Sequence, residues 1–149
     1  IRDMARIRVP IVVTVIGEGG SGGALGVGVG DRVLVLENAY YSVISPEGCA
    51  AILWKDRTKA PDAAAALRLT AKDLLELKLI DEVLKEPLGG AHQGPEETAE
   101  TLKNALLKYL HELEQAPRGS LVESRYAKFR SMGVFHAEKR PREKKITSQ

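Results

Sequence analysis

The chain carries the stretch Gly17-Glu18-Gly19-Gly20-Ser21-Gly22-Gly23-Ala24-Leu25-Gly26-Val27-Gly28-Val29-Gly30, which holds eight of its 14 glycines. It directly follows Pro10-Ile11-Val12-Val13-Thr14-Val15-Ile16, an apolar, β-branched run that predicts a buried strand. Glycine loses more backbone entropy on folding than any other residue, so this density is costly in regular structure. We therefore expect bare backbone to approach another group here. An anion held by the free N–H groups of a helix start is the simplest such group.

Length and composition indicate one globular domain and argue against several functional classes. A chain of 149 residues with 44% hydrophobic residues can bury a core. Its 22 basic and 20 acidic residues nearly balance, which argues against nucleic-acid binding. The single cysteine allows no internal disulfide framework, and no Cys/His cluster predicts a zinc site. No apolar run is long enough for a membrane span and no signal peptide is recognisable, so we expect a cytoplasmic protein.

The hydrophobic pattern predicts short strands early in the chain and helices later. Strands are expected at residues 9–16, 32–36, 40–44 and 80–84. The glycine run should open a helix, and further helices are expected after Ser45 and Thr70 and at 60–69, 95–115 and 120–132. We divide the chain into a domain at 1–94, a helical segment at 95–135 and a basic tail at 136–149. The tail has almost nothing to bury, so we expect it to be disordered.

Two of the helix starts carry capping signals. Ser45 precedes Pro46 and a first-turn carboxylate, which is the pattern of an N-cap followed by proline at the first helical position. Thr70 precedes Asp73 by three residues, as in a capping box with aspartate in place of glutamate. For the long helix at 95–115, the predicted apolar face consists of Leu102, Leu106, Tyr109, Leu110 and Leu113.

Part of the glycine run matches a dinucleotide-binding fingerprint. Residues 17–22 have the spacing G-x-G-x-x-G after a strand, and Glu37 lies at about the distance of a ribose-binding acid. However, only residues 23–30 separate the last motif glycine from Asp31, and this segment is itself rich in glycine. A βαβ crossover needs a dozen or more residues with a stable helix, so the spacing disfavours a Rossmann fold.

Residues 19–23 also match G-x-S-x-G, the nucleophile elbow of serine hydrolases, with Ser21 as the nucleophile. That chemistry needs a histidine base oriented by a carboxylate. Of the three histidines, His111 falls in the long helix and His136 lies near the tail, which leaves His92 in a loop as the candidate base. A serine hydrolase is therefore the alternative enzyme class.

A third interpretation of the run is an oxyanion hole. Backbone N–H groups at a helix start can hold the oxygen of an enolate or a tetrahedral intermediate without any titratable side chain. This would explain why the run has neither an adjacent base nor a P-loop lysine. Close packing of a helix on a sheet would also require glycine, so the spacing alone does not distinguish an oxyanion hole from such packing.

Six motifs occur in order along the chain: VIGEGGSGGAL at residues 15–25, YSVISPEGCAAILWK at 41–55, LTA at 69–71, LID at 79–81, EPLGGAH at 86–92 and RYAKFR at 125–130. Together they resemble the carboxyltransferase α subunit of the multi-subunit acetyl-CoA carboxylase of bacteria and plastids. The resemblance covers nearly all of residues 1–135. It corresponds to the C-terminal half or so of that subunit.

The resemblance implies an α/β chain with the crotonase-like fold, a spiral of ββα units, followed by C-terminal helices. Clp-type serine proteases share this fold and pair a serine at the corresponding helix start with a histidine after the following strands. Here Ser45-Pro46 occupies roughly that histidine's place, and no histidine lies between Ser21 and His92. The protease branch of the fold therefore lacks its base in this chain.

The resemblance also implies the transfer of a carboxyl group from carboxybiotin to acetyl-CoA, giving malonyl-CoA for fatty-acid synthesis. Biotin, the cofactor, would arrive on a separate carrier protein and would not be bound covalently to this chain. A partner β subunit with a Cys₄ zinc element would complete the site, in an α₂β₂ assembly. The α side would receive biotin and the β side the coenzyme A thioester, so no metal is expected in this chain. In a plant or alga the location would be the plastid stroma.

The residues of the site follow from the same resemblance. The backbone N–H groups of Gly22 and Gly23 are implied to form the α-side oxyanion hole. The neighbouring residues implied to contact the substrate are Gly19, Gly20, Ser21 and Ala24. Two alternatives stay open, a serine hydrolase with Ser21 as nucleophile and an assembly module without chemistry that docks through the two C-terminal amphipathic helices.

Overall fold

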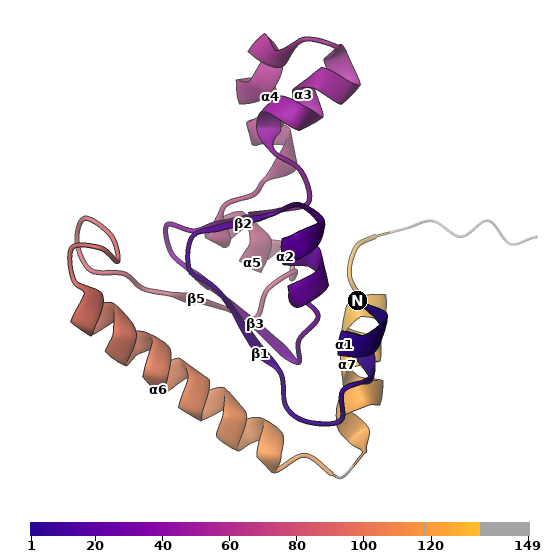
Figure 1. The fold of residues 1–149 in the computed structure, drawn as a ribbon, viewed down its shortest axis with the longest axis vertical. Helices are drawn as coiled ribbons and strands as arrows, with labels where there is room; N and C mark the ends of the chain where they lie inside the picture. The colour runs from indigo at the N-terminus through magenta and orange to yellow at the C-terminus, as the bar shows by residue number, and fades with distance from the viewer. Residues whose placement is uncertain (118, 135–149) are drawn as a thin grey trace, which may run out of the picture.

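Two consecutive ββα units form the centre of the structure, a computed structural model that describes residues 1–117 and 119–134 (Figure 1). The first unit contains β1 (Val12–Val15), β2 (Glu18–Gly20) and α2 (Ser21–Val27). The second contains β3 (Arg32–Leu36), β4 (Tyr40–Ser42) and α3 (Pro46–Trp54). The other elements are α1 (Arg2–Arg6), the 3-10 helix η1 (Arg57–Lys59), α4 (Ala60–Leu67), α5 (Ala71–Glu76), β5 (Glu82–Leu84), α6 (Pro95–Glu114) and α7 (Ser120–Arg130).

The strands of these units pair in two separate parallel sheets. One sheet has the order β1-β3-β5, with Val13 opposite Val33. The other contains β2 and β4, with Gly19 opposite Tyr41. The chain therefore leaves the first sheet after β1, forms β2 in the second sheet and then α2, and returns to the first sheet as β3. The glycine run is thus the connection between two parallel strands and needs no long crossover helix.

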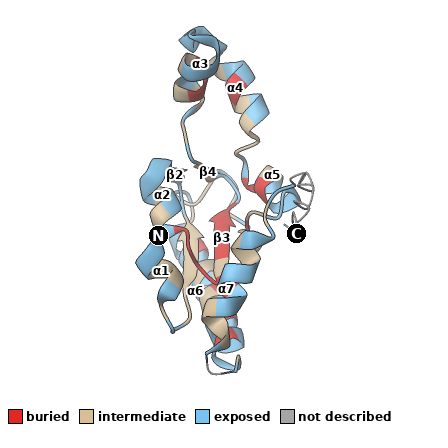
Figure 2. Cartoon of the chain, turned by 90° about the vertical axis from the view of Figure 1, so that its right-hand side faces the viewer, coloured by how far each residue is buried: buried red, intermediate tan, exposed pale blue. Residues whose placement is uncertain are grey.

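The core lies around β3, which Figure 2 shows as the buried centre of the fold. Residues Val33, Leu34, Val35 and Leu36 are each at most 2% exposed. A continuous apolar run of this kind is typical of a strand that is covered on both faces. Leu74 of α5 and Tyr109 of α6 pack into the same core. The helices that follow the two units are therefore part of what stabilises the sheet.

The capping signals in the sequence are confirmed. Ser45 Oγ accepts a hydrogen bond from the Gly48 N–H at 3.1 Å, and Pro46 is the first residue of α3. Thr70 Oγ1 accepts from the Asp73 N–H at 3.3 Å at the start of α5. Each cap satisfies an N–H group that the helix itself leaves free, a contribution of about 1 kcal/mol.

Three elements, α1, β2 and the short η1, and several boundaries were not predicted from the sequence. Neither α1 nor β2 carries a hydrophobic period, because the first is mostly polar and the second reads Glu-Gly-Gly. The predicted strand at 9–16 is β1 at Val12–Val15, and the predicted strand at 40–44 ends at Ser42. The predicted tail at 136–149 lies outside the described residues.

The predicted apolar face of α6 is wrong at one position. The buried residues of this helix are Thr98, Ala105, Tyr109 and Leu113. Leu102 packs partly against the core and Leu106 is half-buried, but Leu110 is 37% exposed. The buried stripe follows a spacing of three and four residues, and Leu110 lies one residue to the side of it. Small residues in the stripe, which a hydrophobic pattern ignores, set its position.

A helical hairpin of α3, η1 and α4 projects away from the rest of the molecule (Figure 1). It has a small core of its own, made of Cys49, Ala50 and Ala63. Close to this core, α3 leaves the large side chains of Ile52, Leu53 and Trp54 exposed. The hairpin is therefore a separate packing unit, connected to the sheet through the segments on either side of it.

Charged contacts hold α7 in place. Arg125 is 1% exposed, and its Nε and Nη2 donate to the two carboxylate oxygens of Asp31 at 2.9 and 2.7 Å. Asp31 also accepts from the Ile11 N–H at 2.8 Å. The guanidinium donates in addition to the carbonyl oxygens of Met4, Ala5, Ile7 and Val9. Both buried charges are thus paired and hydrogen-bonded, as burial requires.

Candidate functional site

The first turn of α2 offers unpaired backbone donors at the end of β2. Gly20 is the N-cap residue, and its position carries no side-chain capping bond. The N–H groups of Ser21, Gly22 and Gly23 come before the first N–H that can bond within the helix, so they lack intrahelical acceptors. Ala24 is the first residue whose N–H can pair inside the helix. The turn therefore presents free donors at the positive end of the helix dipole.

Ser21 sits in a strained backbone conformation at this turn. Its φ is 61°, in the left-handed region that favours glycine. Holding a non-glycine residue there costs on the order of 1 kcal/mol. Backbone strain of this kind is common at ligand-binding and active-site turns, and here it marks the change from strand to helix.

Three glycines of the run are explained by packing inside the chain. A Cβ at Gly19 would lie 2.9 Å from Val15 Cγ1, and one at Gly30 would lie 2.8 Å from Val13 Cγ2. A Cβ at Gly28 would overlap the hydroxyl of Tyr41. At these positions a Cβ would force its neighbours to move, so packing explains the glycine and no ligand is needed.

The other five glycines of the run have no such explanation. A Cβ at Gly17, Gly20, Gly22, Gly23 or Gly26 would meet nothing within 4 Å, and none of these residues has a positive φ. Neither backbone conformation nor close packing among the described residues requires glycine there. This favours the interpretation in which bare backbone at the start of α2 is approached from outside the described residues.

Two cavities flank α2. One, of about 380 Å³, lies against β1 and β2, and Gly19, Gly20, Gly23 and Ala24 contribute to its wall. The other, of about 310 Å³, is more apolar and is lined by Ser21 and Leu25 of α2, by Phe129 of α7 and by Met132 just after α7. Of the residues expected to contact the substrate, Gly19, Gly20 and Ala24 thus line one cavity and Ser21 lines the other. Of the two expected oxyanion-hole residues, Gly23 lines the first cavity and Gly22 lines neither.

The candidate base for Ser21 lies in a different part of the structure. His92 lines a third cavity, of about 450 Å³, together with Asn38 and Glu86, and Ser21 is not part of its wall. His111 is on α6, and His136 lies outside the described residues. Within residues 1–117 and 119–134, no histidine lines either cavity beside α2. The described residues therefore place no histidine beside Ser21 to act as the base of a hydrolase.

Glu86 organises the loop that carries His92. Its carboxylate accepts hydrogen bonds from the Asn38 N–H at 2.8 Å and from the Ala91 N–H at 2.7 Å. Burial works against the charged form, but these bonds from Asn38 and Ala91 hold the pKa of Glu86 below its ordinary value. Glu86 therefore stays ionised and fixes the loop against β3, a structural role that the sequence motif did not reveal.

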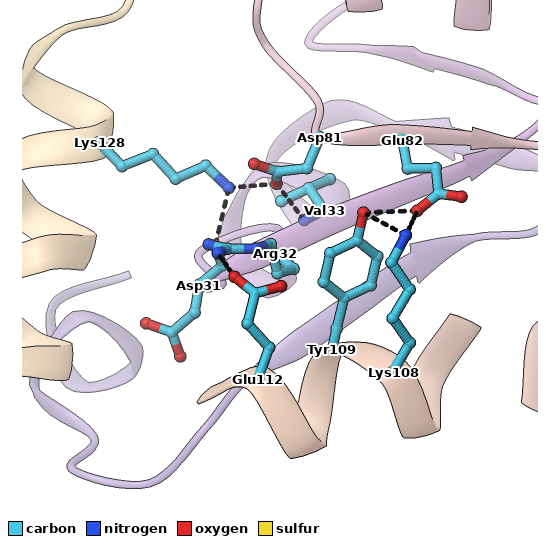
Figure 3. Close-up of polar contacts among 9 residues, drawn as sticks. All are labelled: Asp31, Arg32, Val33, Asp81, Glu82, Lys108, Tyr109, Glu112 and Lys128. Carbon is cyan, nitrogen blue, oxygen red and sulfur yellow. Dashed lines mark hydrogen bonds and ion pairs between the residues drawn. The ribbon is translucent and has the colours of Figure 1, made fainter. Parts of the chain in front are cut away.

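A network of charged side chains lies at the opposite end of the sheet (Figure 3). Lys128 of α7 donates to Asp81 at 2.5 Å and to the Asp31 carbonyl at 3.2 Å. Next to it, Tyr109 donates to Glu82, and this hydrogen bond holds the pKa of Glu82 below its ordinary value. Asp31 and Asp81 precede β3 and β5, whereas the glycine run follows β1. The network joins helices to strand starts and lies away from α2.

Comparison with known proteins establishes the family. Residues 1–133 match the family model described as acetyl co-enzyme A carboxylase carboxyltransferase-like. The chain belongs to this family. The resemblance read from the six motifs is thereby confirmed.

Curated relatives of this carboxyltransferase-like family are highly similar. The chain is 58% identical over 135 residues to a protein of Protochlamydia amoebophila (strain UWE25), and 59% identical over 135 residues to one of Thermosynechococcus vestitus. Both relatives are named acetyl-coenzyme A carboxylase carboxyl transferase subunit alpha. These alignments cover 91% of this chain but only 43% and 42% of the relatives. The chain thus spans about two-fifths of the length of the curated relatives it matches.

Solved structures confirm the fold. A Pseudomonas malonate decarboxylase hetero-tetramer in complex with coenzyme A superposes with a TM-score of 0.62 at 18% identity, over 83% of this chain and 49% of that chain. An enoyl-CoA hydratase from Mycobacterium avium subsp. paratuberculosis K-10 gives a TM-score of 0.53 at 19% identity, over 88% and 53%. The carboxyltransferase-like chain therefore has the α/β crotonase-like fold that the motifs implied.

No helix among the described residues is long and apolar enough to cross a membrane. No three or more His, Cys, Asp or Glu side chains in residues 1–117 and 119–134 are grouped to hold a metal ion. Cys49 is buried in the hairpin core.

Replacing Ser21 by alanine tests the hydrolase alternative. We expect a complete subunit carrying Ser21→Ala to retain most of its activity, because none of the described histidines lines the cavity that Ser21 faces. Loss of a true nucleophile would reduce turnover by several orders of magnitude. Ser21→Gly, which relieves the positive φ, is the matched control and should behave in the same way. An inactive Ser21→Ala variant, together with fluorophosphonate labelling of Ser21 in the wild type, would favour the hydrolase.

Proposed function

We propose that this chain forms part of a carboxyltransferase α subunit that moves the carboxyl group of carboxybiotin to acetyl-CoA, giving malonyl-CoA. The observation that supports the proposal most strongly is the first turn of α2. There, free N–H groups lie beside a cavity of about 380 Å³, and the glycines around them face open space. The family and the names of the curated relatives point to the same activity.

The free amides of Gly22 and Gly23 would act on the oxygen of biotin. Loss of the carboxyl group from carboxybiotin would place negative charge on that oxygen, and preorganised N–H donors stabilise such charge strongly. Bound biotin would supply the group that takes a proton from the methyl group of acetyl-CoA, and the methyl carbon would form its new bond to the carboxyl carbon. This chain then needs no side-chain acid or base. The role of this chain is to stabilise the charge on the biotin oxygen and to leave space for the biotin ring.

Gly19, Gly20 and Ala24 would form the wall against which the carboxybiotin head rests, since all three line the cavity beside the free amides. Ser21 would contribute its N–H group and the sharp turn into α2 rather than its hydroxyl. A side chain at Gly20 or Gly23 would narrow the space that the ring of biotin has to enter. The proposal thus gives the outward-facing glycines of the first turn a function.

The remaining half of the chemistry belongs to partners in this proposal. A β subunit with a Cys₄ zinc element would hold the coenzyme A thioester, and a separate carrier protein would deliver biotin. Cys49 is buried and alone, so this chain offers no such zinc site. We propose an α₂β₂ assembly in the cytoplasm, or in the plastid stroma of a plant or alga.

Reconstitution tests the proposal. We expect the isolated 149 residues to be silent and malonyl-CoA to form when a complete α subunit is mixed with its β subunit, carboxybiotin and acetyl-CoA. Transfer of an isotope-labelled carboxyl group is the measurement. Malonyl-CoA from the 149 residues alone would show that the substrate site is misplaced. A complete α subunit that assembles with β without any transfer would instead support the assembly module.

A further inference from the structure

The Tyr41 side chain of β4 packs directly against α2. Its hydroxyl donates to the Ala24 carbonyl oxygen at 3.3 Å. Its ring lies against Gly19, where a Cβ would come within 3.0 Å of Tyr41 Cδ2. Gly19 is also the residue opposite Tyr41 in the β2–β4 ladder. One side chain therefore contacts both the strand that leads into the glycine helix and the helix itself.

The contact with Gly28 shows how tight this support is. Gly28, the C-cap residue of α2, has φ −67° and ψ −1°, a conformation that any residue adopts. Glycine is nevertheless needed there, because a Cβ would overlap the Tyr41 hydroxyl and lie 2.9 Å from the Ala24 carbonyl oxygen. Space occupied by Tyr41, and not backbone conformation, thus determines the residue at position 28.

Tyr41 is itself held firmly. Its backbone is paired with β2 on one side, and its N–H donates to the Leu69 carbonyl oxygen at 3.2 Å. The ring packs against the core and forms part of the wall of both cavities beside α2. Burial raises the pKa of Tyr41, so the hydroxyl stays protonated and remains a donor near neutral pH.

We propose that Tyr41 is a positioning residue for carboxyl transfer, which fixes the height and tilt of α2 and through it the direction of the Gly22 and Gly23 amides. The inference rests on the proposed function of these amides. An oxyanion hole acts only when its donors point at the place where charge develops, and a displacement of about 1 Å far from the chemistry can lower the rate about 100-fold. Tyr41 contacts α2 at Ala24 and at its C-cap residue Gly28. A displacement of this seven-residue helix at Tyr41 would therefore also displace the amides of its first turn.

A double-mutant cycle between Tyr41 and Gly28 tests the inference in the complete α subunit assembled with its β subunit. We expect Gly28→Ala to lower kcat about 100-fold, because α2 must move away from the hydroxyl. Tyr41→Phe alone should lower kcat only several-fold, because the long hydrogen bond to Ala24 is lost while the ring remains. In the Tyr41→Phe background, Gly28→Ala should lower kcat about tenfold less than in the wild type, since the overlapping oxygen is gone. The KM for carboxybiotin should change little in all three variants.

Tyr40→Phe is the matched control. Tyr40 precedes Tyr41 in the same strand, and its hydroxyl contacts Glu18 at 3.4 Å instead of α2. We expect this variant to keep wild-type kcat. Equal kcat losses for Gly28→Ala in both backgrounds would overturn the inference, as would a change in KM alone.

The same measurements separate this inference from the proposed function. If Gly23→Val keeps full activity, the amides of α2 are not the site, and the proposed function fails together with the inference. If Gly23→Val is inactive while Gly28→Ala and Tyr41→Phe both keep wild-type kcat, only the role of Tyr41 fails. Thermal unfolding of each variant, read by circular dichroism, shows whether a loss of kcat occurs in a folded subunit.

Discussion

Replacing Gly23 by valine is expected to abolish carboxyl transfer while leaving the fold of the subunit intact. A Cβ at position 23 would meet nothing within 4 Å, so a side chain can start there without displacing the described neighbours. It would, however, occupy the cavity beside the free amides and keep the biotin oxygen away from them. Loss of an oxyanion donor typically lowers kcat by about 10²–10³-fold. Malonyl-CoA formation by the complete α and β subunits, with circular dichroism of the variant, measures both effects.

Gly26→Val provides the control for this variant. Gly26 lies one turn further along the same helix, also faces open space and lines neither cavity beside α2. Its N–H lies beyond the first turn and is not a free donor. We expect Gly26→Val to keep most of the activity. If both valine variants are equally inactive, a surface contact of α2 and not the amides of its first turn is what matters.

Replacing Arg125 by methionine is expected to produce the largest loss of stability in the chain. Methionine fills much of the same space but leaves the Asp31 carboxylate, 3% exposed, without its partner. Breaking a buried ion pair by removing one partner typically costs about 3–5 kcal/mol, because an uncompensated charge remains buried. The carbonyl oxygens of Met4, Ala5, Ile7 and Val9 would lose their hydrogen bonds from Arg125 as well. Urea denaturation of wild type and variant gives the difference in the free energy of unfolding.

The exposed ion pair between Arg68 and Glu76 is the comparison for this prediction. Its side chains are 42% and 55% exposed, and solvent screens such pairs. We expect Glu76→Gln to change the free energy of unfolding by less than about 1 kcal/mol. The double variant Arg125→Met, Asp31→Leu should recover part of the loss of Arg125→Met, because no unpaired charge is then buried. A loss below about 1 kcal/mol for Arg125→Met would show that the buried pair contributes no more than a surface pair.

Local signals in the sequence predicted the local structure of this chain well. The apolar run of β3 and the caps at Ser45 and Thr70 depend on neighbours within a few residues, and all three are confirmed. The order of the motifs identified the family, and through it the fold. What the sequence could not show is the division of the strands between two sheets, because β2 has no hydrophobic pattern of its own.

The other features of the candidate site depend on contacts between residues that are far apart in the sequence, so sequence patterns could not predict them. The sequence alone does not distinguish the eight glycines of the run from one another. Their neighbours in the structure show which of them are closely packed and which face open space. Tyr41 looked like an ordinary strand residue, because its role depends on a hydroxyl placed beneath Gly28 and Ala24. Phe129 and Met132 line the apolar cavity from α7 and just beyond it, and α7 is held by the contacts of Arg125 with Asp31 and of Lys128 with Asp81.

The bonds of Arg125 also bear on the order in which the chain can fold. They connect residues 94 to 121 positions apart, so they join the N-terminal residues of this stretch to the last helix described. During synthesis, the ββα units and their sheets can form as soon as they leave the ribosome, because their partners are close in the sequence. The carbonyl groups of residues 4–9 and the Asp31 carboxylate must wait for α7 to emerge. The segment around α1 is therefore made before the ββα units but is among the last of the described segments to be completed.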